Sequence, residues 1–206
     1  MRPTELVPQF AEPHQASREQ LRFGLALKTL GLFNKIVLAD SFLSGAVDRV
    51  YDGDKIPGAL DAWVGTLAFS GQIFCDFAGY STTAIGAALC LGFFLPDNFR
   101  FPYAAVGFAD FWRRWHITLS SWLRDYIFIP LGGNRRRAGR PYFALFVTML
   151  LAGLWHGASW TFVAFGGLHG LYLASERALR MRFRAYQPGP VVFVLFGLTA
   201  PDPAVV

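Results

Sequence analysis

Three histidines are the side chains in this sequence best suited to move a proton near neutral pH. His156 lies in the string GLWHGASW, His116 in FWRRWHITLS and His169 in GGLHGLY. A neutral imidazole can accept a proton from a hydroxyl group. We predict that His156 is a catalytic base, because its glycine neighbours leave room for a substrate beside the ring. The alternative is a packing histidine that bonds to a backbone carbonyl.

The other two histidines carry less specific signals. His116 could orient a substrate or a second histidine, or could equally be an interfacial residue. His169 lies thirteen residues after His156, which is about 3.6 helical turns, so the two rings would be well apart on one continuous helix. This spacing favours a structural role for His169 over a shared site.

Charged residues near these histidines suggest supporting roles. Asp76 is the one charge between Ala62 and Pro96, and we expect it to pair with an arginine such as Arg113 or Arg124, with acid or base chemistry as the alternative. Arginine stays protonated, so Arg113 and Arg114 are predicted to hold Asp76 or the anionic part of a donor. The predicted substrate-binding or supporting residues are Arg113, Arg114, Asp76, Trp155 and Trp112.

Several familiar reaction centres are missing from the sequence. It has no HExxH, GxSxG or GxxxxGK[ST] string, and its two cysteines, Cys75 and Cys90, lie in apolar stretches without the partners of a zinc site. We therefore predict no metal and no cofactor. A histidine without a side-chain nucleophile fits direct transfer, in which an acceptor hydroxyl attacks an activated acyl group such as a thioester.

The composition indicates where such chemistry would take place. Hydrophobic residues make up 53% of the 206 positions and charged residues only 16%, with a net charge of +5. The basic residues cluster at the ends of apolar segments, which is typical of membrane proteins and argues against nucleic acid as the partner. We predict an all-α, polytopic, multi-helix integral membrane protein with re-entrant or broken helices around a central cavity.

The apolar periodicity predicts the helices that must position the histidines. Residues 22–42 read as an amphipathic or marginally spanning helix, and residues 62–96 are long enough for one crossing plus a second, partial one. Residues 108–129 read as one helix, too charged to face lipid and suited to the headgroup zone or a protein-lined cavity.

Residues 142–175 contain no Asp, Glu, Lys or Arg and are bounded by basic segments at 135–140 and 177–184. The positive-inside rule places both basic segments on the cytoplasmic side. The 34 residues of this run span roughly 51 Å as helix, short of the roughly 60 Å that two full crossings need. We predict that the chain turns back within the membrane between Gly153 and Trp160.

The two ends of the sequence suggest a partial protein. Residues 1–20 contain no continuous apolar stretch, and residues 191–198 begin an apolar helix that stops near Pro201. We expect residues 1–206 to form a single partial domain that is truncated at both ends.

Two long strings resemble a known family. FADFWRRWHITLSSWLRDYIFIPLGGNRRR and LLAGLWHGASWTFVAFGGLHGLYLASER are similar to segments of the membrane-bound O-acyltransferase family, in the branch with the alginate O-acetyltransferase membrane subunit and the D-alanyl transfer protein. The resemblance covers about residues 6–177. The branch's Phe-Ser-Gly-Tyr segment and Pro-Glu-Asn-Phe turn correspond here to FAGY at 77–80 and PDNF at 96–99, which are conservative departures.

The resemblance implies that His156 is the characteristic histidine and His116 a second active-site histidine, whereas His169 is not the usual catalytic residue. It implies transfer of an acyl group, which we expect to be acetyl from acetyl-CoA as substrate, to a hydroxyl acceptor on a cell-surface polysaccharide such as alginate. The implied surroundings are the bilayer of the bacterial inner membrane and an extracytoplasmic acetyl-transfer partner protein or polysaccharide. A histidine-containing transporter or channel and an inactive structural fragment are the alternatives.

Overall fold

The computed structural model describes residues 6–11, 15–53, 57–133 and 139–183, and within these ranges it contains helices and no strands. This confirms the all-α prediction. The elements in chain order are η1 (Val7–Phe10), α2 (Arg18–Leu32), η2 (Phe33–Leu43), α3 (Ser44–Tyr51), α4 (Ala59–Cys90), η3 (Pro102–Ala104), α5 (Phe108–Arg114), α6 (Ile117–Leu123), η4 (Arg124–Phe128), α7 (Arg140–His156) and α8 (Trp160–Arg182).

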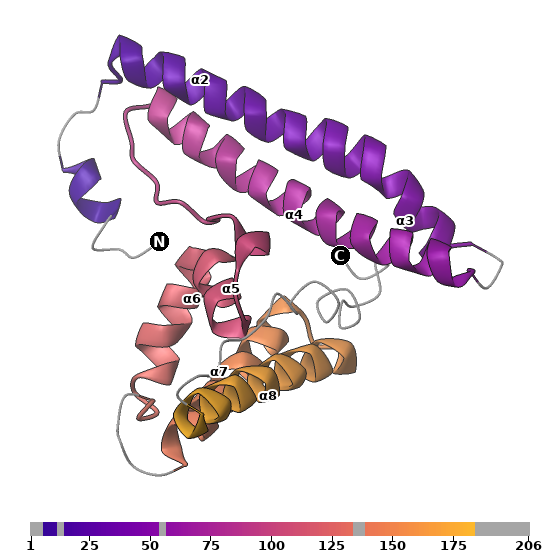
Figure 1. The fold of residues 1–206 in the computed structure, drawn as a ribbon. Helices are drawn as coiled ribbons and strands as arrows, with labels where there is room; N and C mark the ends of the chain where they lie inside the picture. The colour runs from indigo at the N-terminus through magenta and orange to yellow at the C-terminus, as the bar shows by residue number, and fades with distance from the viewer. Residues whose placement is uncertain (1–5, 12–14, 54–56, 134–138, 184–206) are drawn as a thin grey trace. The chain divides into compact units, whose positions relative to one another are not determined.

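The chain forms two compact units, Met1–Phe99 and Arg100–Val206. In the first unit, α2, η2 and α3 form one long helical segment that runs antiparallel to α4 (Figure 1). The segment begins where Ser17 and Gln20 satisfy each other's backbone N–H groups in a capping box. The expected helix at 22–42 is confirmed and extends further in both directions.

The prediction of a second, partial crossing within residues 62–96 is wrong. The region is a single 32-residue helix, α4, about 48 Å long. Its glycines allow close packing instead of a break: a Cβ at Gly79 would lie 2.7 Å from the carbonyl oxygen of Gly31, and one at Gly24 would lie 2.7 Å from that of Gly86. Small residues at these positions let the two helix backbones approach each other.

Two helical segments, Arg18–Tyr51 and Ala59–Cys90, are long and apolar enough to cross a membrane. Only 17% and 28% of their most apolar windows are buried within the described structure. Most of this apolar surface is therefore exposed, as it would be in a helix that faces lipid or further membrane helices.

In the second unit, the region predicted as one helix at 108–129 is broken at its centre. α5 ends at Arg114, and α6 starts after His116, whose backbone is left-handed with φ 45° and ψ 55°. The prediction of one continuous helix is wrong because a left-handed residue cannot continue a right-handed helix. The break places His116 at the N-terminus of α6.

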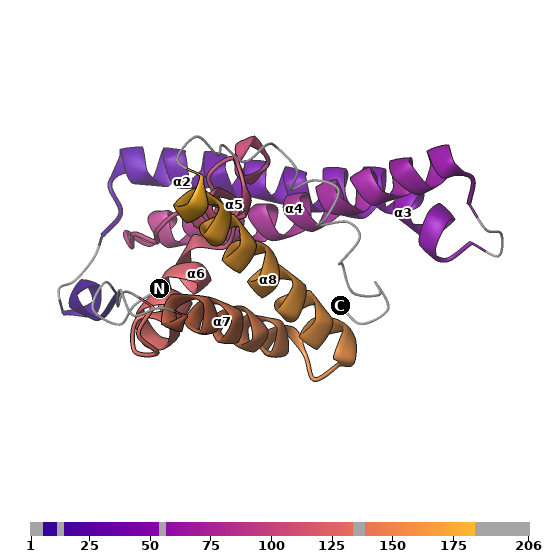
Figure 2. The ribbon, with the colours of Figure 1, turned by 60° about the horizontal axis from the view of Figure 1, so that its bottom comes forward.

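α7 and α8 form an antiparallel hairpin, as predicted for residues 142–175 (Figure 2). The turn between His156 and Trp160 lies inside the predicted interval. A Cβ at Gly153 would lie 3.0 Å from the Cα of Gly166, and the Tyr142 hydroxyl donates to the Met181 sulfur at 3.4 Å near the other end of the hairpin.

The two basic ends of the hairpin, at Arg140 and Arg182, consequently lie at the same end of the α7–α8 pair. The basic stretch at 134–138, the basic segment beyond residue 183 and the expected helix at 191–198 lie outside the described residues.

Candidate functional site

His156 is the last residue of α7, at the point where the hairpin turns. Gly157 is extended and ends the helix, and the Ser159 side chain accepts a hydrogen bond from the Thr161 N–H as α8 begins. The imidazole stacks on the Phe162 ring with centroids 5.8 Å apart, and the residue is solvent-exposed in this structure. The predicted irregular backbone next to His156 is confirmed.

The structure brings His116 and His156 to the same aromatic side chain. The Trp155 indole lies 6.0 Å from the His116 ring and 5.2 Å from the His156 ring, measured between centroids. Burial, aided by the charge that His156 can carry, lowers the pKa of His116 to about 4. His116 is therefore neutral at pH 7 and can accept or donate one hydrogen bond.

His169 is buried, with 1% of its surface exposed, and belongs to the same aromatic cluster. The Phe165 ring lies 4.5 Å from the His169 ring and 5.9 Å from the His156 ring. The Trp112 indole packs edge-on against His169 at 5.4 Å. The spacing argument treated His156 and His169 as part of one helix. They lie on different helices of the hairpin, and both rings pack against Phe165.

Arg113 and Arg114 do not pair as we expected. Both contact Asp110 on their own helix, at 3.5 Å for Arg113 and 2.9 Å for Arg114. Burial alone would raise the pKa of Asp110, but the Val106 N–H and the two guanidinium groups together hold it below its usual range. Arg114 thus helps fix α5, and Arg113, whose side chain is 69% exposed, is the freer of the two to meet a ligand.

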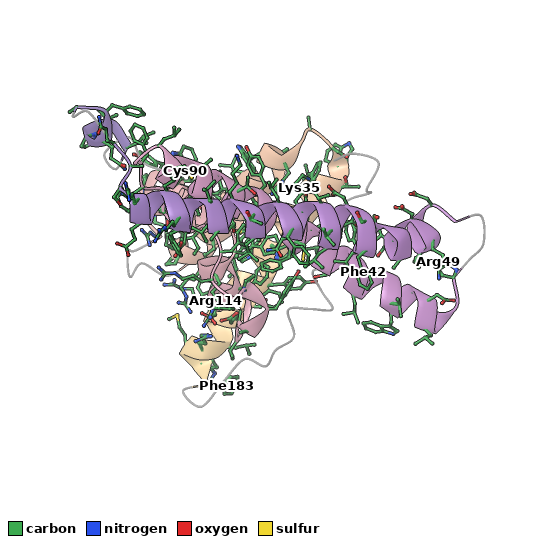
Figure 3. The ribbon with its side chains drawn as sticks, turned by 90° about the horizontal axis from the view of Figure 1, so that it is seen from above. Lys35, Phe42, Arg49, Cys90, Arg114 and Phe183 are labelled. Atoms are coloured by element: carbon green, nitrogen blue, oxygen red, sulfur yellow. The ribbon has the colours of Figure 1, made fainter. Side chains whose placement is uncertain are left out.

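Asp76 forms an ion pair, as predicted, but its partner is Lys35 and not an arginine. Lys35 lies in η2 along the long helical segment (Figure 3) and also approaches Asp40 at 3.8 Å. The pair joins the two helices of the first unit. The sequence shows both charges in apolar helices, but not the helix register that makes them meet.

Glu176 is a positioning residue that the sequence did not indicate. It is 4% exposed, and its carboxylate accepts the backbone N–H groups of Phe108 at 2.6 Å and Ala109 at 3.2 Å. Arg180 pairs with its other oxygen at 2.8 Å. This carboxylate attaches the start of α5 to α8 and so fixes Trp112 beside His169. Its negative charge directly before the basic segment at 177–184 was the only signal in the sequence.

A cavity of about 490 Å³ opens between α5, α6, η4, α7 and α8. We call it the Arg177 cavity. Its walls are mostly apolar, and its polar lining includes Trp112, Arg113, Arg124 and Arg177. Neither His116 nor His156 lines it, so the cavity and the histidine pair are separate features of the second unit.

Within the described ranges, no three His, Cys, Asp or Glu side chains gather closely enough to hold a metal ion. An imidazole in such an aromatic surrounding can accept a proton from a hydroxyl group. The catalytic and supporting roles assigned to His156, His116, Trp155, Trp112, Arg113, Arg114 and Asp76 remain predictions.

Comparison with known proteins identifies relatives that share stretches of more than 100 residues with this chain. The chain is 50% identical over 151 residues to the probable alginate O-acetylase AlgI of Azotobacter vinelandii, which covers 73% of this chain and 30% of that protein. It is 42% identical over 177 residues to a peptidoglycan O-acetyltransferase of Helicobacter pylori, covering 85% of this chain and 33% of the relative.

A third relative is a teichoic acid D-alanyltransferase of Streptococcus thermophilus, 37% identical over 114 residues that cover 52% of this chain and 28% of the relative. The chain thus spans about a third of the length of the relatives it matches. The model of the membrane-bound O-acyltransferase family, MBOAT, matches residues 9–199, which include His116, His156, His169 and both long helices. The chain therefore belongs to the membrane-bound O-acyltransferase family.

Proposed function

We propose that the complete protein is an O-acetyltransferase of the bacterial inner membrane, with several membrane crossings. It moves an acetyl group from a cytoplasmic thioester donor, acetyl-CoA, to a hydroxyl acceptor in the O-acetylation of an alginate-like cell-surface polysaccharide. Family membership and the names of the relatives support O-acyl transfer. The acceptor is the polysaccharide itself or an extracytoplasmic partner protein that passes the acetyl group on.

The observation that carries this proposal is the placement of His156. It occupies a helix end at the turn of the hairpin, within the uncharged run 142–175, and its ring packs against the Trp155 indole that His116 also meets. α7 is 17 residues long, so it rises about 26 Å from its basic end, less than the roughly 30 Å of a hydrocarbon core. His156 would therefore lie close to the far side of the membrane, where an extracytoplasmic hydroxyl can reach it.

The proposed step needs only the donor, the acceptor and a base. His156 takes the proton of the acceptor hydroxyl while the hydroxyl oxygen attacks the thioester carbonyl carbon. A carbon–oxygen bond forms and the carbon–sulfur bond breaks. The leaving thiolate recovers the proton and departs as a free thiol, which leaves His156 neutral again. No protein nucleophile, metal or cofactor takes part.

His116, whose ring packs against the same Trp155 indole, assists the base. Because it is neutral at pH 7, it can orient the acceptor or donate a hydrogen bond to the carbonyl oxygen as negative charge develops there. Its contribution should be smaller than that of the base.

Alanine variants of the three histidines in the complete protein test the proposal. A positioned base contributes about 10²–10⁴-fold in rate, roughly 3–5 kcal/mol of barrier. We expect His156→Ala to lose nearly all acetyl transfer while remaining folded and inserted, His116→Ala to lose less, and His169→Ala to lose least. Transfer would be measured with radiolabelled acetyl-CoA, and folding by monodispersity and thermal stability. Wild-type turnover by a well-folded His156→Ala protein would overturn the mechanism.

A further inference from the structure

Two buried hydrogen-bond donors line the Arg177 cavity and have no acceptor among the described residues. They are the indole Nε1 of Trp112 on α5 and the guanidinium Nε of Arg177 on α8; both residues line the cavity, and the two nitrogen atoms themselves are buried. A buried donor without an acceptor costs about 1–3 kcal/mol, and more when it is charged. Two such donors on residues that line one cavity favour the binding of an acceptor there.

The charges around the cavity show what kind of acceptor fits. Arg177 has no ion-pair partner in the part of the chain that the structure describes, whereas Arg124 pairs with Asp125 at 2.9 Å. Arg113 adds a third guanidinium whose contact with Asp110, at 3.5 Å, is loose. Three guanidinium groups on one cavity favour an anion, and the planar fork of arginine matches phosphate oxygens.

The rest of the cavity wall is apolar. Leu145 and Met149 on α7 and Leu173 on α8 line it beside the charged groups. A small hydrated anion would leave these apolar side chains exposed to water. A ligand with a phosphate at one end and an apolar or flexible chain at the other would cover both the donors and the walls.

We propose that the Arg177 cavity binds the phosphate of an amphipathic phosphoester, held by Arg177 and the Trp112 indole, with Arg113 and Arg124 at the rim. Two molecules carry this chemistry: an anionic phospholipid of the bilayer and the phosphate-bearing arm of the thioester donor. The donor reading rests on the proposed acetyl transfer, whereas the phospholipid reading is independent of it.

The test is a binding measurement on the complete protein in detergent, by native mass spectrometry. The probes are phosphatidylglycerol, coenzyme A and, as a control without phosphate, diacylglycerol. Each probe is applied to the wild type, to Arg177→Gln and to Arg182→Gln. The last is a charge-matched control, because Arg182 is exposed and lies more than one turn further along α8.

We expect one phosphate probe to bind the wild type and Arg182→Gln equally, and to bind Arg177→Gln about 10- to 100-fold more weakly. Binding of phosphatidylglycerol would identify the lipid as the source, and binding of coenzyme A the donor. Equal binding to both variants, or no phosphate probe bound above the diacylglycerol level, would overturn the proposal. The binding measurement is repeated on His156→Ala, which should bind the phosphate probe like the wild type even though it lacks the proposed base. Binding by the cavity is thereby tested separately from acetyl transfer.

Discussion

At residue 116 the backbone and the side chain can be tested separately. A left-handed conformation costs a residue with a Cβ about 1–2 kcal/mol, which glycine avoids while losing more entropy on folding. We expect His116→Gly and His116→Ala to lose the same amount of acetyl transfer, because both lack the imidazole. His116→Gly should be the more stable variant by up to about 1 kcal/mol.

Thermal unfolding and turnover of both variants in the complete protein would check this. If His116→Gly kept wild-type activity while His116→Ala lost it, the left-handed backbone and not the ring would be what the site needs.

Glu176 is the residue whose loss should most affect the packing of α5. Glu176→Ala leaves the Phe108 and Ala109 amides without their acceptor, at about 1–3 kcal/mol each, and leaves Arg180 unpaired. Glu176→Gln keeps a carbonyl oxygen for the amides and should be milder. The readout is thermal stability of the complete protein, with the exposed Glu19→Ala as control. Equal stability of Glu176→Ala and Glu19→Ala would contradict this role.

At the scale of the helices, two glycines of α8 and α7 form a matched test of the hairpin. A Cβ at Gly153 would meet the backbone of Gly166 at 3.0 Å, whereas one at Gly167 would meet nothing within 4 Å. We expect Gly153→Ala to destabilise the hairpin by about 1–3 kcal/mol through overpacking. Gly167→Ala should be neutral or slightly stabilising, because alanine favours helix by about 0.5–1 kcal/mol. The measurement is thermal unfolding of the two variants. If Gly167→Ala were the less stable of the two, α7 and α8 would not be closely packed at Gly153.

The hairpin was predictable from the sequence because length and charge alone define it. An uncharged run of fixed length between two basic segments must return to its starting side, and the glycines and Ser159 mark the turn. The break at His116 was not predictable, because the residues of FWRRWHITLS have no glycine or proline to mark it. Tertiary packing of Trp115, which is 6% exposed, overrides the local helical preference there.

The candidate site also has features that the sequence predicts and features that it does not. The three histidines could be identified from residue type and from family resemblance, but their meeting around Trp155 and Phe165 depends on helix packing that one sequence does not encode in a readable pattern. The ion-pair partners predicted for Asp76 and for Arg113 and Arg114 were wrong for a related reason. Complementary charge narrows the choice of partners, and only the register of α2, η2 and α4 selects Lys35.

For the whole molecule, the orientation in the membrane follows from the hairpin. Both basic ends, at Arg140 and Met181–Arg182, should face the cytoplasm. Single cysteines at Arg140 and Met181, in a protein whose Cys75 and Cys90 are replaced by alanine, should react with an impermeant maleimide only after the cells are permeabilised. Labelling of either position from outside intact cells would reverse the orientation and remove the argument for the depth of His156.

The ion pair between Lys35 and Asp76 also bears on how the protein is made. Each charge alone opposes entry of an isolated helix into lipid by roughly 2.5–3.5 kcal/mol. Because the first long helix leaves the ribosome before α4 does, Lys35 at first has Asp40 of its own segment, at 3.8 Å, as a nearby carboxylate, and it can pair with Asp76 only later. Once α4 follows, the two charges neutralise each other across the glycine-lined contact. We therefore expect the pair of helices, and not either helix alone, to be the unit that leaves the translocon for the bilayer.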